Sequence, residues 1–207
     1  AYLVTRYHMY NQVYFHKVNM LTQNYLVDML SRAQVLAEQG DLSLDHRLEQ
    51  MLVNESLSPV QYAELNDSHI KVALSDWAKH EDTILSLYAD KLLSRRGFHK
   101  SLRINTLDIN MVDAVKQRLE EFIQSHGYDP EIHVLYATIS KRGYMPYEQG
   151  IKLEDGRDVS EHSAMIRSLA LPNERAMVFV PEDIRDAAEA VVRDWIKPSQ
   201  SSLSQFS

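Results

Sequence analysis

The sequence predicts a mostly α-helical protein whose second half is a smaller α+β region. Over residues 2–39, apolar side chains recur at intervals of three and four residues, which is the period of an amphipathic helix. From Phe98 onward, short β-branched and aromatic runs alternate with helical patterns. We therefore expect a helical half followed by a small mixed sheet with helices on one face, in the order β-α-β-β-α-β-α.

The first half of the chain contains only helical patterns. Residues 2–39 form one long helix or two abutting helices, and Gly40 supplies a C-terminal stop. Shorter helices are predicted over residues 45–53, 58–65, 67–79 and 81–95. The second of these opens with a Ser-Pro pair, which is typical of a helix start. Because Gly97 closes this half, we expect a helical domain over residues 1–97.

The second half alternates between strands and helices. Strands are predicted at residues 102–104, 133–139, 149–153 and 176–180. Helices are predicted at residues 110–126 and 160–169 and, after the Pro-Glu-Asp cap at residues 181–183, to about residue 196. We expect an α+β domain over residues 98–197, followed by a flexible Ser/Gln-rich tail over residues 198–207.

The composition excludes several classes of protein. With 22 Lys+Arg and 29 Asp+Glu, the net charge of −7 argues against a general nucleic-acid coat. No apolar stretch approaches the ~20 residues that span a bilayer, and no basic-then-apolar leader opens the chain. The absence of cysteine excludes disulfides, thiolate metal sites and cysteine nucleophiles. We therefore expect a cytoplasmic protein with no membrane partner.

The most distinctive chemistry lies in the first predicted helix. Residues 1–27 contain no acid but include five of the 11 tyrosines. At ~100° per residue, one face carries a guanidinium, two phenols and an ammonium, from Arg6, Tyr10, Tyr14 and Lys17, with His16 on its flank. These groups suit a multiply charged phosphate ester. The alternative is an amphipathic core helix whose tyrosines pack in the interior and whose cations are solvated.

A second acid-free basic stretch runs from Lys91 to Arg103 and includes Arg96 and Lys100. Part of this charge can simply complement the dipole of the preceding helix, an effect of about 0.3–1 kcal/mol per charge. Two such stretches in an acidic protein nevertheless suggest an anionic ligand. The HExxH, P-loop, GxGxxG and GxSxG motifs are all absent.

The run Arg-Tyr-His-Met-Tyr-Asn-Gln-Val-Tyr-Phe-His-Lys at residues 6–17 resembles a helix of the HD-superfamily phosphohydrolases. The specific branch is the deoxynucleoside triphosphate triphosphohydrolases (dNTPases), in which this helix follows the metal-binding core. Arg-Gly-Phe-His-Lys at residues 96–100 is similar to the segment that opens the family's C-terminal α+β region. The likeness in motif order covers roughly residues 1–105; beyond them it is architectural only.

The resemblance implies roles for individual residues. Arg6 would contact the triphosphate of the substrate, and Tyr10 and Tyr14 would line the pocket beside its sugar and base. A regulatory nucleotide at a subunit boundary would be bound by His16, Lys17, Arg96 and Lys100. The resemblance also implies a homo-oligomer.

The chain departs from the family pattern in one respect. The superfamily's His…His-Asp…Asp metal ligands lie upstream of this helix, and no His-Asp dipeptide occurs here. The chain also opens inside a helical pattern without Met or a capping residue, so we expect the C-terminal part of a longer enzyme; removal of Met before Ala1 is the alternative. We expect no catalytic residue, cofactor or metal ligand in this segment, and a divalent metal in the parent enzyme.

Three functional hypotheses follow. The first is a fragment of a nucleotide phosphohydrolase that converts a dNTP to a deoxynucleoside and triphosphate, to which this chain contributes substrate-phosphate and regulatory contacts. The alternative is a non-catalytic regulatory or oligomerisation module that binds nucleotides or a partner protein. The third is a single-stranded nucleic-acid binder that stacks bases on the tyrosines. The negative charge and the regular helical spacing of the tyrosines count against a nucleic-acid partner.

Overall fold

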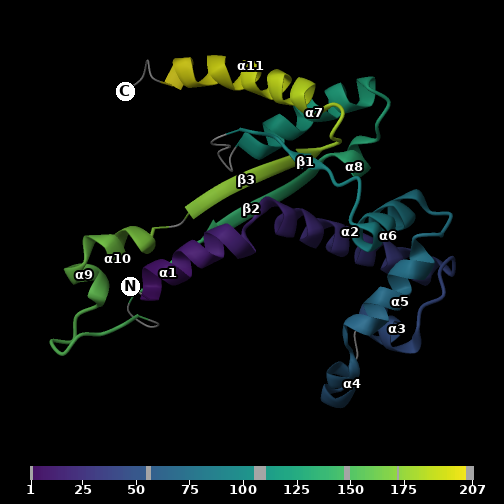
Figure 1. Ribbon diagram of the computed structural model, residues 1–207, viewed down its shortest axis with the longest axis horizontal. Helices are drawn as coiled ribbons and strands as arrows, with labels where there is room; N and C mark the ends of the chain where they lie inside the picture. The colour runs from purple at the N-terminus through teal and green to yellow at the C-terminus, as the bar shows by residue number, and fades with distance from the viewer. Residues whose placement is uncertain (1, 55–56, 105–110, 147–149, 172, 204–207) are drawn as a thin grey trace. The chain divides into compact units, whose positions relative to one another are not determined.

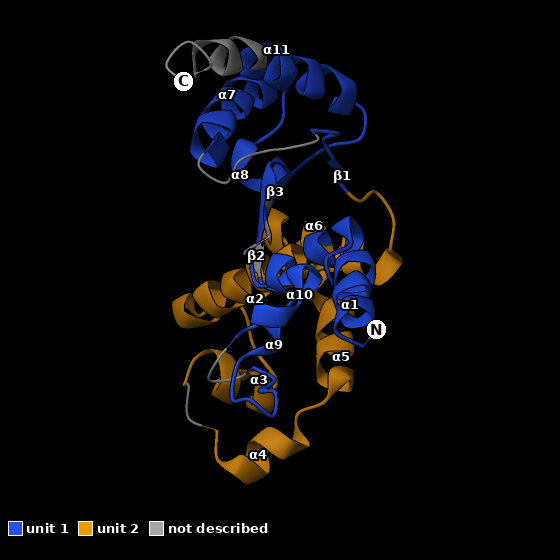
Figure 2. Ribbon diagram, turned by 90° about the vertical axis from the view of Figure 1, so that its left-hand side faces the viewer, with its two compact units in different colours: residues 1–21, 99–207 blue, residues 22–98 orange. Residues whose placement is uncertain are grey.

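The computed structural model of the protein describes residues 2–54, 57–104, 111–146, 150–171 and 173–203 (Figure 1). The chain divides into two compact units, Thr22–Phe98 in one and Ala1–Leu21 with His99–Ser207 in the other (Figure 2). The boundary at Phe98 lies beside the joint expected near Gly97. The first helical residues, however, group with the second half of the chain, so the division into two consecutive domains stays a prediction.

The described part of the unit Thr22–Phe98 is built from helices. They are α2 (Lys17–Gln39, which begins in the other unit), α3 (His46–Leu52), α4 (Pro59–Glu64), α5 (Asp67–Trp77) and α6 (Thr83–Ser94). Tyr25, Met29 and Ala33 lie four residues apart on α2 and are completely buried. They form the core-facing stripe that the three- and four-residue period predicts. The centroid of the Tyr25 ring lies 5.2 Å from that of Tyr88 on α6.

Local capping explains where these helices begin and end. Each of α3, α5 and α6 begins with a side chain that accepts a hydrogen bond from a backbone N–H of the first turn: Asp45, Asn66 and Asp82. At α4, Ser58 and Gln61 form the capping box at the predicted Ser-Pro start. Gly40, with φ of 83°, follows α2, and the N–H of Asp41 donates to the carbonyl of Leu36 at 2.9 Å. The predicted stop at Gly40 is therefore confirmed.

The first predicted helix is not continuous. It consists of α1 (Tyr2–Met9), the π-helical turn η1 (Tyr10–Tyr14) and, after a break at residues 15–16, α2. Side-chain amides compete with the helical hydrogen bonds here, because Asn11 Nδ2 donates to the carbonyl of Tyr7 at 3.0 Å and Asn19 Nδ2 donates to that of Val13 at 2.7 Å. Of the two interpretations of residues 2–39, separate abutting helices are confirmed and one long helix is wrong.

The other unit contains a small sheet with strand order β1-β3-β2. Its strands are β1 (Lys100–Ser101), β2 (Leu135–Lys141) and β3 (Asn173–Val180). Both pairings are antiparallel, with Lys100 opposite Val180 and Leu135 opposite Phe179. The helices of this unit, besides α1, are α7 (Val112–Ser125), α8 (Pro130–His133), α9 (Val159–His162), α10 (Ala164–Leu169) and α11 (Arg185–Leu203). The predicted architecture, mostly helical with a small sheet, is confirmed.

One face of the sheet carries the core of this unit. Val115, Leu119 and Ile123, four residues apart on α7, are completely buried against Val178 and Val180 of β3. Ala188 and Val192 of α11 belong to the same cluster, and Figure 1 shows α7 and α11 on the same side of β3. Helices therefore cover one face, as the alternation of strand and helix patterns predicts. None of the helices described has the length and apolar character needed to span a bilayer.

Several predicted boundaries differ from the structure. The strand expected at residues 102–104 is displaced to β1, although Leu102 N still donates to the carbonyl of Val178 at 2.9 Å. A strand was also expected at residues 149–153. Residue 149 lies outside the described residues, and residues 150–153 form no strand but contribute Lys152 to a single β-bridge with Asp158. The helix expected at residues 160–169 is split into α9 and α10 by Ser163, whose hydroxyl caps α10.

The last helix also extends past its predicted end. Pro198 and the Ser/Gln-rich composition indicate an end near Ile196, whereas α11 continues to Leu203. Proline inside a helix removes one hydrogen bond but does not by itself prohibit the helical backbone. Residues 198–203, expected in a loose tail, are therefore helical, and residues 204–207 lie outside the described part of the chain.

Candidate functional site

The strongest candidate site is a pocket beside α1 and η1. From these helices it is lined by Arg6, Tyr7, Tyr10 and Asn11, and from the end of β2 and the segment after it by Ile139, Arg142 and Gly143. All of these residues belong to the same compact unit. The pocket brings together two guanidinium groups and two phenol rings.

Arg6 and Tyr10 are placed together by the helical repeat. They lie four residues apart, and the guanidinium carbon of Arg6 lies 5.5 Å from the centroid of the Tyr10 ring. This distance is within the range of a cation–π interaction. Arg6 is exposed and Tyr10 is half-buried, so neither is sealed in the core. Two of the three sequence-predicted substrate residues, Arg6 and Tyr10, therefore lie at one accessible pocket.

Tyr14 contributes from outside the pocket wall. The π turn is marked by Phe15 N, which donates to the carbonyl of Tyr10 five residues earlier at 2.9 Å. The Tyr14 ring lies 4.8 Å from that of Tyr10, with 31° between the planes, and is 51% exposed. Phe15 adds a third ring 6.1 Å from Tyr10. The result is an aromatic cluster next to the guanidinium of Arg6.

His16 and Lys17 lie beyond the break and do not share this pocket. The Nδ1 atom of His16 accepts a hydrogen bond from Val18 N at 3.3 Å, so the imidazole caps the start of α2. Lys17 instead lines a separate pocket of about 520 Å³, open space included, with Ser101, Leu102 and Met177. The predicted single face from Arg6 to Lys17 is wrong, because its constant 100° rotation does not survive the π turn and the break.

Arg96 and Lys100 lie in different compact units. Arg96 is exposed in the segment after α6, and its backbone N–H donates to the hydroxyl of Ser94 at 3.2 Å. Lys100, on β1, lies 3.5 Å from a carboxylate oxygen of Glu182. Lys100 therefore already has an anionic neighbour within its own unit.

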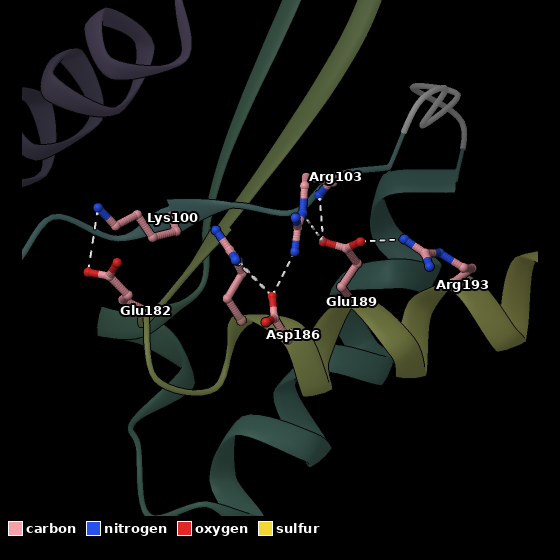
Figure 3. Close-up of polar contacts among 7 residues, drawn as sticks. Lys100, Arg103, Glu182, Asp186, Glu189 and Arg193 are labelled. Carbon is pink, nitrogen blue, oxygen red and sulfur yellow. Dashed lines mark hydrogen bonds and ion pairs between the residues drawn. The ribbon is translucent and has the colours of Figure 1, made fainter.

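The basic segment after β1 also contributes to a network on α11 (Figure 3). Glu189 is 5% exposed and accepts hydrogen bonds from Arg103 N at 3.0 Å and from the Arg103 and Arg193 side chains. The backbone N–H of Arg103 is the main cause that lowers the pKa of Glu189. Asp186 pairs with the guanidinium of Arg103 at 2.9 Å. Arg103 thus joins the end of β1 to α11, which is a structural role.

Two further clusters of polar side chains lie wholly or partly buried in this unit. Asp158, 2% exposed, accepts hydrogen bonds from Tyr144 Oη at 3.0 Å and from Ser160 Oγ at 2.6 Å. Burial is the main cause that raises the pKa of Tyr144. His99 Nε2 lies 3.1 Å from His133 Nδ1. Within the ranges that the structure describes, no three His, Asp or Glu side chains are grouped so that they could hold a metal ion.

Sequence reasoning missed Arg142 and Gly143. Arg142 follows a strand rather than the first helix, so no periodic pattern connects it with Arg6. Gly143 lies so close to α1 that a Cβ atom at this position would be 2.5 Å from Cδ2 of Tyr7. A glycine just after a predicted strand was the available signal, since such residues often mark a close approach of two backbones.

No protein-family model matches the sequence. The uncharacterised protein YwfO of Bacillus subtilis is 25% identical over 181 residues, which cover 82% of this chain and 41% of that protein. A phosphohydrolase of Bacteroides thetaiotaomicron, known from a crystal structure, is similar with a TM-score of 0.65 and 26% identity over 87% of this chain and 49% of its own. This chain has the fold of part of a phosphohydrolase.

A second solved structure has the same fold. A hypothetical protein of Aquifex aeolicus is similar with a TM-score of 0.60 and 22% identity, over 92% of this chain and 43% of its own. The chain thus spans less than half the length of each of these relatives.

Proposed function

We propose that the chain is the C-terminal part of an HD-superfamily phosphohydrolase that converts a dNTP to a deoxynucleoside and triphosphate. The observation that carries this proposal is the pocket in which exposed Arg6 lies 5.5 Å from the ring of Tyr10. The phosphohydrolase from Bacteroides thetaiotaomicron, whose fold this chain shares, supports the reaction class. In this role the chain supplies contacts to the nucleotide, while the metal-dependent step belongs to another part of the enzyme.

Each side chain of the site has a role suited to its chemistry. The guanidinium of Arg6 offers paired N–H donors to phosphate oxygens, and this geometry favours Arg over Lys. Tyr10 and Tyr14, with ring centroids 4.8 Å apart, present aromatic surface and hydroxyls to the sugar and base. Because Arg6 is exposed, a phosphate group can reach it without a rearrangement of the core.

A regulatory nucleotide site is the second part of the proposal. Lys17 lines the pocket beside β1 and β3, and Lys100 lies on β1 of the same unit. His16 and Arg96 complete the set by family resemblance. For Lys100 to bind phosphate, the anion must compete with Glu182, 3.5 Å away. Subunit contacts in a homo-oligomer belong to the same proposal.

The parent enzyme is expected to use a divalent metal, which would activate water and polarise the scissile phosphoryl group. The described residues do not fit such a centre, because no three candidate ligands are grouped among them. We therefore assign no step of metal chemistry to this chain. Its own residues bind the phosphates and orient the nucleoside.

A thermal-shift experiment on this chain tests the role of Arg6. A ligand at about 100 times its Kd stabilises a protein by ~2.7 kcal/mol, which raises Tm by roughly 5–10 °C at this chain length. We expect a dNTP to produce such a shift, with or without divalent metal, and Arg6→Ala to abolish most of it. Arg118→Ala is the control, since Arg118 is an exposed residue of α7 that pairs with Glu121. An unchanged shift in Arg6→Ala would contradict the assignment.

A non-catalytic oligomerisation module is the second candidate, and exposed apolar side chains on the first helices favour it. Tyr2 is 75% exposed, Val13 52% and Met9 42%. Clustered apolar side chains on a surface mark interaction sites. Two observations separate the candidates. The coding sequence upstream of Ala1 contains the His…His-Asp…Asp motif only if the enzyme proposal holds, and light scattering of the isolated chain reports whether it self-associates.

A further inference from the structure

We infer that Arg142 is a second phosphate-binding residue, and that the pocket beside α1 holds a polyphosphate chain between Arg142 and Arg6. This inference deepens the proposed function and rests on it. It assigns a binding role to a residue in the segment after β2, far from the first helix in sequence. Figure 1 shows the end of β2 close to α1, within one compact unit.

The charge of the pocket indicates an anionic ligand. Arg6 and Arg142 both line it, and no acid occurs among its described lining residues. Like charges that share a small concave surface raise the local positive potential and repel each other. A bound anion with several negative oxygens relieves this repulsion, whereas a neutral ligand does not. The pocket is therefore electrostatically complementary to an anion.

Arg6 and Arg142 differ from other arginines of the same unit. Several of these are already within ion-pair distance of a carboxylate: Arg103, Arg118, Arg157, Arg185 and Arg193. Within the described part of the chain, neither Arg6 nor Arg142 makes such a pair, and both are exposed. Their guanidinium groups are thus available to a ligand without the loss of a protein ion pair.

The backbone around Arg142 is held firmly. Gly143 N and Tyr144 N both donate to the carbonyl of Leu169, at 2.8 and 3.1 Å. The hydroxyl of Tyr144 donates to buried Asp158 and accepts from Ile151 N at 2.6 Å. On the other side, the absence of a side chain at Gly143 lets this segment lie directly against Tyr7. Arg142 therefore extends from a fixed point beside α1, which reduces the cost of ordering it on binding.

The presence of two guanidinium groups, those of Arg6 and Arg142, favours a polyphosphate over a monovalent anion as the ligand. A single carboxylate can satisfy one guanidinium by paired hydrogen bonds. Two guanidinium groups match a chain of phosphates, in which successive groups each carry charge. Tyr14, which is 51% exposed and lies beside Tyr10, offers aromatic surface for a nucleoside attached to that chain. The same phosphate chemistry is offered by a dNTP and by inorganic tripolyphosphate, so both are needed as probes.

Calorimetric titration of the chain with tripolyphosphate and with a dNTP tests the inference. We expect Arg142→Gln to weaken binding of both by about tenfold or more, as for loss of a hydrogen bond between charged groups. Arg142→Lys keeps the charge but loses the paired donors, so it should bind with intermediate affinity. Arg118→Gln is the matched control and should bind like the wild type. The melting temperature of each unliganded variant establishes that it is folded.

The outcomes separate this inference from the proposed function. If Arg6→Gln weakens binding while folded Arg142→Gln binds as tightly as the wild type, the role of Arg142 is overturned and the proposed function stands. If the wild type binds neither probe, or if Arg6→Gln has no effect, both are overturned. Tighter binding of the dNTP than of tripolyphosphate, with both weakened in Arg142→Gln, supports the inference and identifies the nucleotide as the source of the phosphates. If the wild type binds the dNTP and tripolyphosphate equally tightly, and Arg142→Gln weakens binding of both, the result supports the phosphate site. It then identifies no contact with the nucleoside.

Discussion

Gly143 determines how closely the segment after β2 approaches α1. Its backbone lies outside the left-handed region, so a side chain here is opposed by contact rather than by φ. An added Cβ atom would lie 2.5 Å from Cδ2 and 3.2 Å from Cε2 of Tyr7. Because a ring edge cannot bend away as the end of a flexible side chain can, α1 or the segment would have to move. The position of Arg142 relative to Arg6 therefore depends on a glycine.

We predict that Gly143→Ala destabilises the protein by about 1–3 kcal/mol, the usual cost of overpacking. Urea denaturation measures this change. The same substitution in a Tyr7→Ala background is the control, and there it should cost less, because the atoms that the new methyl group meets are gone. An equal cost in both backgrounds would show that the contact with Tyr7 is not the cause.

Some residues of the candidate site could be predicted from the sequence, and others could not. Arg6 and Tyr10 were identifiable because both lie on one helix, where a spacing of four residues places them side by side. Arg142 was not, because its proximity to Arg6 arises from the packing of α1 against a segment more than a hundred residues away. The pairing of Lys100 with Glu182 also depends on sheet and turn geometry that no local pattern specifies.

At the scale of elements, the break after η1 decides which side chains share a surface. The sequence period correctly predicts helices on both sides of it. The position of the break was not predicted, because the side chains of Asn11 and Asn19, which bond to backbone carbonyls, do not alter the apolar period. As a consequence, Lys17 lines a different pocket from Arg6. The roles assigned to these two residues therefore belong to separate sites.

The start of α6 supplies a pH-dependent prediction. Asp82 caps α6 through Leu85 N at 2.9 Å and accepts a hydrogen bond from Arg32 Nε at 3.0 Å. The hydrogen bond from Arg32 is the main cause that lowers the pKa of Asp82. Since the folded pKa is below the unfolded one, this stabilisation is fully present above the ordinary pKa of 3.8 and is lost as the pH falls through the folded value.

We expect Asp82→Asn to lower the unfolding free energy at pH 7 by about 1–2 kcal/mol, because Asn retains the cap but loses the charge paired with Arg32. Urea denaturation between pH 7 and pH 3 measures the difference between the variant and the wild type. That difference should shrink as the pH falls below about 4, because the Asp82 carboxylate of the unfolded chain then becomes protonated while that of the folded chain stays charged until its lower pKa is reached. A difference that stays constant over this range would contradict the assigned role of the charge.

At the scale of the whole molecule, the sequence predicted the architecture better than its boundaries. The period of apolar residues along the sequence predicts the helical first half, the change of character near Gly97 and the strand at residues 176–180. The buried cores preserve these periods. The grouping of residues 1–21 with the second half could not be predicted, because it depends on contacts between segments distant in sequence. The continuation of α11 through Pro198 likewise opposes the local preference of its residues.

The proposed function requires that the pocket beside α1 bind the phosphates of a nucleotide. The most direct test is a crystal structure of the chain with a dNTP at saturating concentration. We expect phosphate oxygens within hydrogen-bond distance of the Arg6 guanidinium, with the nucleoside beside the ring of Tyr10. A nucleotide bound only elsewhere, with this pocket containing solvent alone, would contradict it.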